Sequence, residues 1–256
     1  MMADTGESDQ QLAVTTCGCA SEMRRVCDLC DGSDGMFVAC SLTCLTRHLA
    51  DNHGGDVAAR ESSETRARLY LGRLNRRLTD SRERYQQHRG EVMALALAAA
   101  EAAPATGAAS AGDIAIFGAG NGTDLDLPRL ADSFREIHLV DLDGEALERA
   151  RQDLPAALRE RVIPHAPVDL SGFMSHLDDW GESFPDDATL GQAAHGTARA
   201  IIAGLGRGFD VVLSTGALSQ LIVPYHRAWI TSQGNWARLD AAIVAVHLAT
   251  VVGSTR

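Results

Sequence analysis

The sequence predicts an α/β protein with a parallel sheet, preceded by a small module rich in cysteine and histidine. Three observations predict the sheet: two apolar runs, residues 114–117 and 137–140, lie one helix length apart; a glycine-rich turn, residues 118–122, follows the first run; and Asp141 ends the second. Glycines let the backbone approach a ligand closely, and an acid about 20 residues further on accepts hydrogen bonds from ribose hydroxyls. This order predicts a nucleotide-like ligand site.

The first predicted module, residues 15–58, is a cluster of metal ligands. All six cysteines lie between Cys17 and Cys44, and in a reducing compartment such clustering favours metal binding over disulfides. Together with two histidines they make enough ligands for two tetrahedral zinc sites. The predicted ligands are Cys17, Cys19, Cys27, Cys30, Cys40, Cys44, His48 and His53.

The number of zinc ions stays open between two and one, with a metal-free module as the third alternative. Residues 40–48, CSLTCLTRH, resemble the end of the HIT and MYND zinc fingers. That resemblance implies interleaved pairs, with one zinc held by Cys17, Cys19, Cys40 and Cys44 and the other by Cys27, Cys30, His48 and His53. The chain departs from those families in its C-x-C first pair and its final histidine. The simpler alternative is one zinc at Cys27, Cys30, Cys40 and Cys44.

A metal in this module is expected to be structural. Four protein ligands leave no open coordination position for catalysis, and a core this small needs a metal or a disulfide to be stable. HIT and MYND modules typically bind proteins, so the resemblance also implies a docking role.

The second predicted segment, residues 59–103, is helical and rich in arginine. Leu71, Leu74 and Leu78 follow the helical spacing, which predicts one or two amphipathic helices. Residues 60–89 hold nine arginines and four acids. They form either a surface for an anionic partner such as RNA or a solvated helix face, and the scarcity of aromatic residues favours the second. The residues from 101 to 112, rich in Ala, Gly and Pro, are expected to be a linker.

The third predicted region, residues 113–256, is the ligand-binding domain. Beyond the opening unit, the hydrophobic pattern predicts a helix ended by Pro155, a third strand that ends at Asp169, and a fourth strand that ends at Ser214. The predicted ranges are a helix at 144–154, strands at 161–168 and 209–214, and a last helix packed on the sheet at 239–251.

The glycine spacing carries a family resemblance. The pattern G-x-G-x-G at residues 118–122 resembles motif I of the Rossmann-like class I S-adenosylmethionine-dependent methyltransferases, and LVDLDGEAL at 139–147 resembles their motif II. The resemblance implies that the turn binds the methionine end of the cofactor, Asp141 the ribose and Asp169 the adenine. The predicted cofactor-binding residues are Gly118, Ala119, Gly120, Asn121, Gly122, Asp141, Leu142, Asp169 and Ser214.

The chain departs from this family before the glycine turn. The family usually has an acid two residues before the first glycine, where Ile116 stands here. Asp124 is one substitute for the lost contact, and it is equally well explained as a helix-start residue favoured by the helix dipole. Asp169 also has an alternative role, as a cap for the segment that follows it.

The loop after the fourth strand lies, by the same resemblance, beside the transferred methyl group. It lacks the N/D-P-P-Y sequence of many amide and base N-methyltransferases, which weighs against those acceptors. Thr215, Ser219 and Gln220 are the polar residues nearest the expected methyl position, and Tyr225 and His226 are alternatives for a base. The sequence assigns a catalytic role to none of them.

The resemblance also implies strands that the sequence does not supply. Class I methyltransferases have a fifth strand beside the fourth, and usually two more. The fourth strand is therefore expected to be an exposed apolar edge, either in a truncated product or beneath a partner or a second copy.

Composition limits the partners and the compartment. A net charge of -11 argues against general affinity for nucleic acid or anionic membrane. The first residues lack a signal sequence, and the apolar run near the C-terminus is expected to be too short to span a bilayer. We therefore expect a soluble, cytoplasmic protein.

The predicted function is an S-adenosylmethionine-dependent methyltransferase with a structural zinc module, acting on a small molecule or protein. Two alternatives stay open. One is a non-catalytic zinc-finger interaction protein with a nucleotide-like ligand site, and the other is a zinc-containing RNA methyltransferase that uses the arginine-rich helix.

Overall fold

The chain divides into two compact units, Met1–Ser62 and Ser63–Arg256. The computed structural model describes residues 14–16, 25–26, 36–39, 63–78, 82–102, 111–152, 154–215, 220–223, 225 and 233–256. The eight predicted metal ligands lie outside the described residues: Cys17, Cys19, Cys27, Cys30, Cys40, Cys44, His48 and His53.

The first unit contains a small three-stranded sheet. Its strands are β1 (Val14–Thr16), β2 (Arg25–Val26) and β3 (Met36–Ala39). The central strand β3 pairs in parallel with β1 and antiparallel with β2. In the sequence, each strand ends immediately before a predicted ligand cysteine.

Two helices open the second unit. The arginine-rich segment forms α2 (Ser63–Arg77) and α3 (Gln86–Ala102), and both belong to the same unit as the large sheet. The first strand of that sheet, β4 (Ala111–Phe117), starts inside the predicted linker.

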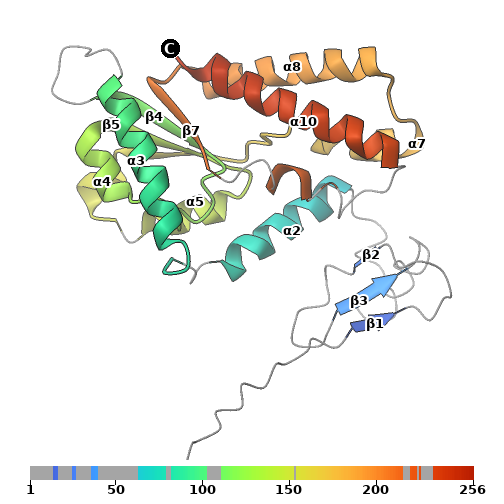
Figure 1. Ribbon diagram of the computed structural model, residues 1–256, viewed down its shortest axis with the longest axis horizontal. Coiled ribbons are helices and arrows are strands. Elements are labelled where there is room, and N and C mark those ends of the chain that lie inside the picture. Colours follow the sequence, from blue (N-terminus) through green and yellow to red (C-terminus); the bar gives the residue numbers. More distant parts are fainter. Residues whose placement is uncertain are drawn as a thin grey trace, which may run out of the picture. The chain divides into compact units, whose positions relative to one another are not determined.

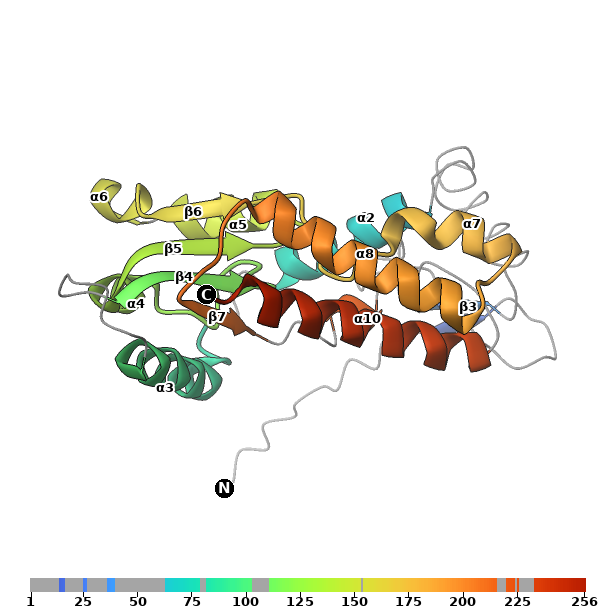
Figure 2. The ribbon, with the colours of Figure 1, turned by 90° about the horizontal axis from the view of Figure 1, so that it is seen from above.

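The sheet of the second unit is entirely parallel. Strands β5 (Phe134–Val140), β6 (Val162–His165) and β7 (Val211–Ser214) join β4 in the order β6-β5-β4-β7 (Figures 1 and 2). The third, second, first and fourth strands along the chain thus lie side by side, which is consistent with a Rossmann-like fold. The prediction of an α/β protein with a parallel sheet is confirmed.

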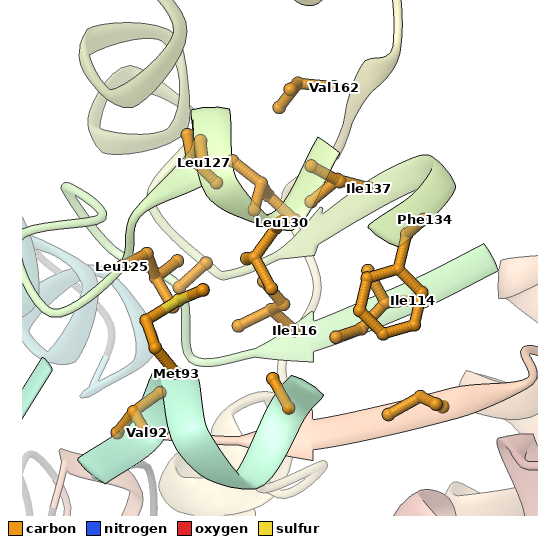
Figure 3. Packing of buried hydrophobic residues seen from close by; sticks show 14 of the residues in the cluster. Val92, Met93, Ile114, Ile116, Leu125, Leu127, Leu130, Phe134, Ile137 and Val162 are labelled. Carbon is orange, nitrogen blue, oxygen red and sulfur yellow. The ribbon is translucent and has the colours of Figure 1, made fainter. Parts of the chain in front are cut away.

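One face of the sheet carries the larger apolar core. Side chains alternate along a strand, so Ile114 and Ile116 of β4 point to this face. They pack against Val92 and Met93 of α3 and against Leu130 (Figure 3). The helices on this face include α4 (Leu127–Ser133) and α5 (Gly144–Gln152).

Two long helices, α8 (Asp187–Leu205) and α10 (Gln233–Ser254), pack on the other face through their C-terminal ends, and Figure 2 shows them extending beyond the strands. Ala115 and Phe117 of β4 pack toward them with Leu205 and Phe209. A further apolar cluster joins α2, α8 and α10 to two short elements. These are the 3-10 turn η1 (Met174–His176) and α7 (Leu177–Glu182).

The sequence does not predict three of these helices. They are α7, α8 and the four-residue α6 (Ala156–Arg159). Helix α8 is rich in Ala and Gly, so its apolar stripe is faint. Its ends nevertheless carry clear signals, because the Asp186 carboxylate accepts from the amide of Thr189 and Gly206 ends the helix in a left-handed conformation.

Helix α10 is longer than the predicted 239–251. Its segment Gly234–Ser254 is, by length and composition, long enough and apolar enough to cross a membrane, and it is the one such helix among the described residues. This corrects the expectation that the run is too short. Leu239, Ile243 and Val246 pack into the core, and 39% of the most apolar window is buried. A helix that buries only one face in the protein core is compatible with a soluble protein.

Strand β7 lies at the edge of the described sheet, as predicted. At its start the chain end runs alongside it: the amide of Phe209 donates to the carbonyl of Ser254, and the amide of Arg256 donates to the carbonyl of Phe209, each at 2.8 Å. The backbone before the strand is thereby paired on both sides.

Candidate functional site

The glycine turn leaves β4 in a conformation that only glycine adopts readily. Gly118, Gly120 and Gly122 all have positive φ angles, of 75°, 48° and 64°. The Gly118 amide donates to the carbonyl of Val140 at 2.9 Å, which ties the turn to the end of β5. The spacing of the glycines therefore reflects a backbone requirement.

Asp141 follows β5 and holds the same turn. Its carboxylate accepts from the amide of Gly120 and from the amide of Asp143, both at 2.9 Å. Asp141 is 9% exposed, and burial raises its pKa above the ordinary value. One acid thus organises the turn and offers its exposed edge to a neighbouring cavity.

Helix α2 packs onto the turn through Asn75. The Asn75 amide donates to the Asp143 carboxylate at 2.9 Å, and the Asn121 side chain donates to the Asn75 carbonyl. The Asn75 Oδ1 atom lies 3.4 Å from where a Cβ on Gly120 would stand. A side chain at Gly120 would therefore press on α2.

Two cavities lie at the carboxyl ends of the strands and share Gly118 and Gln220 in their linings. The larger, of about 100 Å³, is lined by Asn75, Leu78, Tyr85, His88, Gly118, Ala119, Gly120, Asn121, Thr123, Asp124, Thr215 and Gln220. The smaller, of about 30 Å³, is lined by Leu71, Gly118, Asp141, Leu142, Val168, Asp169, Leu170, Met174, Gln220 and Leu221.

These cavities bring together most of the predicted cofactor-binding residues. Those on the larger cavity are Gly118, Ala119, Gly120 and Asn121. Those on the smaller are Gly118, Asp141, Leu142 and Asp169. Gly122 and Ser214 line neither of the two cavities.

Ser214 faces the opposite side of the sheet. Its hydroxyl lies 2.7 Å from Nε2 of His247, a buried residue of α10. The next residue, Thr215, faces the larger cavity instead, because side chains alternate along an extended chain. Burial lowers the pKa of His247, which keeps the imidazole neutral at neutral pH.

Asp124 carries a charge into the larger cavity. It is not the cap of the following helix, because the Asp126 carboxylate accepts from the amide of Arg129 and begins α4. Burial raises the pKa of Asp124, and its Oδ2 lies 4.0 Å from Nε2 of His88. The Thr215 hydroxyl is buried close by. It weakly lowers the pKa of Asp124 but has no partner of ordinary hydrogen-bond geometry among the described residues.

Asp169 caps the segment that follows it, which is the alternative role given to it in the sequence analysis. Its carboxylate accepts from the amides of Ser171 and Met174, both at 3.0 Å, and so holds the start of η1. The Ser171 hydroxyl joins this carboxylate to the hydroxyl of Tyr225. Tyr225 is completely buried, and burial holds its pKa well above the ordinary value. A buried neutral phenol in this position is part of the core.

A separate group of charged residues lies around the start of β4, away from both cavities. Ligand atoms of Asp113, Glu136 and His138 lie within 4.8 Å of one another, as metal ligands do. Three guanidinium groups already neutralise the two carboxylates, which leaves no net negative charge for a metal ion. They are those of Arg135, Arg207 and Arg256.

The structure adds site residues that the sequence analysis assigned to a solvated helix. Leu71, Asn75 and Leu78 of the α2 region, with Tyr85 and His88 at the start of α3, line the cavities. The sequence contains one indication of this role. Asn75 is a polar residue on the apolar stripe of Leu71, Leu74 and Leu78. Ser219 and His226 lie outside the described residues.

Comparison of the chain with protein-family models, curated proteins and solved structures found no match in any of the three.

Proposed function

We propose that the second unit binds S-adenosylmethionine and transfers its methyl group to an acceptor. The convergence of three separate stretches on one site carries this proposal. The glycine turn after β4, Asp141 after β5 and Asp169 after β6 all border two neighbouring cavities at the carboxyl ends of parallel strands. Ligands of open α/β sheets bind at that place.

The residues present suit the parts of this cofactor. Asp141 offers carboxylate oxygens to ribose hydroxyls, and the apolar residues Leu142, Val168 and Met174 suit an adenine ring. Asp169 already accepts two backbone hydrogen bonds and one from the Ser171 hydroxyl. A carboxylate has about four acceptor sites, so one remains for an exocyclic amine.

Asp124 supplies the acid that is missing before the glycine turn. Ile116 occupies the family position and is completely buried in the core. Asp124 presents a largely buried carboxylate to the larger cavity and forms no ion pair with a guanidinium group among the described residues, although Arg89 is close enough to lower its pKa somewhat. A ligand ammonium group would compensate that charge. We therefore assign Asp124 to the amino group of the cofactor's methionine end.

Ligand entry requires α2 to move. The cavities, of about 100 and 30 Å³, are smaller than the roughly 300 Å³ at which small-molecule pockets begin. Helix α2 supplies Leu71, Asn75 and Leu78 to their walls. Among its described side chains, only Ala67 and Asn75 are buried. Such an element opens at low cost, and we propose that it closes over the bound cofactor.

Bound cofactor would supply a sulfonium methyl group. An acceptor's lone pair would take this methyl group, leaving the electrons of the carbon–sulfur bond on sulfur, and the acceptor's proton would pass to a base or to water. The chain's contribution is orientation of the two reactants. Thr215 and Gln220, on the wall of the larger cavity, are the described polar residues closest to the expected acceptor.

We also propose that the first unit binds structural zinc. The support is the spacing of its cysteines and histidines, together with the register of its sheet. Thr16 lies opposite Val38 in the parallel pair β1–β3, so the chain leaves both strands at the same end. Cys17 and Cys40 follow those strands in the sequence, which favours the interleaved scheme in which they share one zinc.

Calorimetric titration with S-adenosylhomocysteine tests the cofactor proposal. Wild-type protein is expected to bind one equivalent, and Asp141→Ala to lose at least tenfold in affinity. Asp132→Ala, which removes an exposed acid of α4, is the matched control and should bind like wild type. Thermal unfolding of each variant establishes that it is folded. Folded wild-type protein that does not bind the ligand would overturn the proposal.

A further inference from the structure

The arginines of the α2–α3 segment differ in whether they have a partner within the protein. Arg68 donates to Glu64 at 2.8 Å, and Arg76 lies 3.9 Å from Glu145. Arg89 donates to the carbonyl of Thr123 at 3.0 Å and so ties α3 to the glycine turn. The side chains of these three arginines therefore make contacts within the protein.

Three others have no such role. Arg77, Arg82 and Arg84 are exposed, and their side chains have no ion pair or hydrogen bond with any described residue. Among the other arginines whose side chains the structure describes, only Arg129 and Arg199 are also exposed and without an ion pair or hydrogen bond. Three of the five arginines without such a contact thus fall within eight residues of sequence, a stretch that also contains Asp80 and Glu83. We call Arg77, Arg82 and Arg84 the arginine rim.

Two arginines of the rim adjoin cavity-lining residues in the sequence. Leu78 and Tyr85, which follow Arg77 and Arg84 directly in the sequence, line that cavity, as does His88 on the next turn of α3. The rim and the cavity interior have opposite charge, because Asp124 lies inside. An anionic group is therefore attracted to the mouth and repelled from the interior.

We propose, on the basis of the methyltransferase function above, that the acceptor carries a phosphate group held by the arginine rim. Guanidinium groups match phosphate oxygens in charge and in fork geometry, and several together suit a group with more than one negative charge. The phosphate stays at the mouth while the acceptor's nucleophile reaches the cavity between Tyr85 and Thr215. A strand of nucleic acid and a small phosphorylated molecule both offer this chemistry.

The test measures binding of phosphate probes to protein saturated with S-adenosylhomocysteine. Pyrophosphate is titrated by calorimetry, and a fluorescein-labelled single-stranded RNA of twelve nucleotides by fluorescence anisotropy at several salt concentrations. Arg82→Gln/Arg84→Gln removes two charges from the rim. Arg129→Gln/Arg199→Gln removes two exposed, uncompensated charges elsewhere and is the matched control.

We expect the rim variant to weaken binding at least tenfold and the control to remain within twofold of wild type. RNA that binds at least tenfold more tightly than pyrophosphate, with a salt slope reduced by about 0.7 for each lost contact, would identify a nucleic-acid acceptor. Comparable affinities would identify a small phosphorylated one.

Two results would overturn the inference: no binding of either probe to the loaded wild-type protein, or equal losses in the two double variants. The cofactor titration is separate, since loading with S-adenosylhomocysteine is measured before either probe is added. Failure to load would overturn the proposed methyltransferase function, whereas loading without phosphate binding would overturn only the assignment of the acceptor.

Discussion

Buried acids in the second unit fall into two groups, which differ in whether arginine ion pairs offset the cost of burial. Burial alone would raise the pKa of Asp113, but the guanidinium groups of Arg135 and Arg207 outweigh burial and hold it below its ordinary value. Asp124 and Asp141 form no ion pair with a guanidinium group among the described residues. Burial raises the pKa of both, although His88 and Arg89 act in the opposite direction on Asp124. The first arrangement stabilises the fold, whereas the second leaves negative charge at a cavity, as binding sites do.

For Asp124 this difference predicts a ligand-specific effect. Asp124→Asn should weaken binding of S-adenosylhomocysteine by roughly tenfold or more, because a charge-assisted hydrogen bond is worth about 1.5–3 kcal/mol. Binding of 5′-methylthioadenosine, which lacks the amino-acid part, should not change. Calorimetry with both ligands on both proteins measures this. An equal loss for the two ligands would show that Asp124 acts on the shape of the site and not on an ammonium group.

The histidine pair between β5 and β6 predicts a pH dependence of stability. His138 Nδ1 lies 2.8 Å from His165 Nε2, and burial is the main cause that lowers the pKa of both. Arg207 lowers both further, while Glu136 acts in the opposite direction on His138. Histidines of the unfolded chain take up protons near pH 6.5, so below that pH the native state binds fewer protons than the unfolded state.

The contribution of these histidines to the free energy of unfolding should therefore be greatest above about pH 6.5. It should decrease as the pH is lowered through that value toward the folded pKa values. Denaturant titrations at pH 8 and pH 5.5 measure the change. His138→Gln should make it smaller, whereas His195→Gln, at an exposed position of α8, should leave it as in wild type. Raised pKa values of Asp124 and Asp141 act in the opposite direction, so the comparison with the variant isolates the histidines.

At the scale of elements, the helical layer over the sheet contains a close approach at Gly172. Gly172 has a φ of 76°, and a Cβ there would overlap the side chain of Thr197 on α8. Gly196, the preceding residue of the same helix, has ordinary helical geometry and open space around it. Alanine at the two positions should therefore have opposite consequences for stability, although Gly172 contacts Thr197 and Gly196 directly precedes it in the sequence.

Substitution of each by alanine tests this. Gly172→Ala should lower the free energy of unfolding by about 2 kcal/mol or more, because it adds both backbone strain and overpacking. Gly196→Ala should raise it by about 0.5–1 kcal/mol, since alanine favours the helix. Urea titrations of both variants measure the changes. A loss of similar size at Gly196 would mean that α8 packs differently from the arrangement described.

At the scale of the whole molecule, the chain is two units joined at Ser62. Every residue of the three described hydrophobic clusters lies in the second unit. The second unit therefore has its own core, whereas the first is expected to depend on metal. Structure and ligand binding of the second unit should not require the first.

Expression of residues 63–256 alone tests this independence. The fragment should bind S-adenosylhomocysteine within about twofold of the full chain, because all the proposed binding residues and the helix α2 are retained. Treatment with a metal chelator should leave its unfolding midpoint unchanged and should remove zinc from the full chain. Metal analysis and circular dichroism measure both. A fragment that does not fold would show that the first unit completes the core.

Local pattern was sufficient for the central part of the fold. The apolar runs that became β4, β5, β6 and β7 were predictable, because a strand's apolar residues and the breakers at its ends lie next to one another in sequence. The positive φ angles of Gly118, Gly120 and Gly122 follow from glycine spacing in the same way. Boundaries and the helix α8 were less predictable, since packing across the sheet decides them.

The sequence alone established the parallel α/β class, the glycine turn and the acids that follow the second and third strands, because each depends on residues close together in the chain. Tertiary structure decided the rest of the site. Asn75 reaches Asp143 across 68 residues, and Thr215 rather than Ser214 faces the cavity. Each of these is a choice among neighbours made by long-range packing, which no local pattern encodes.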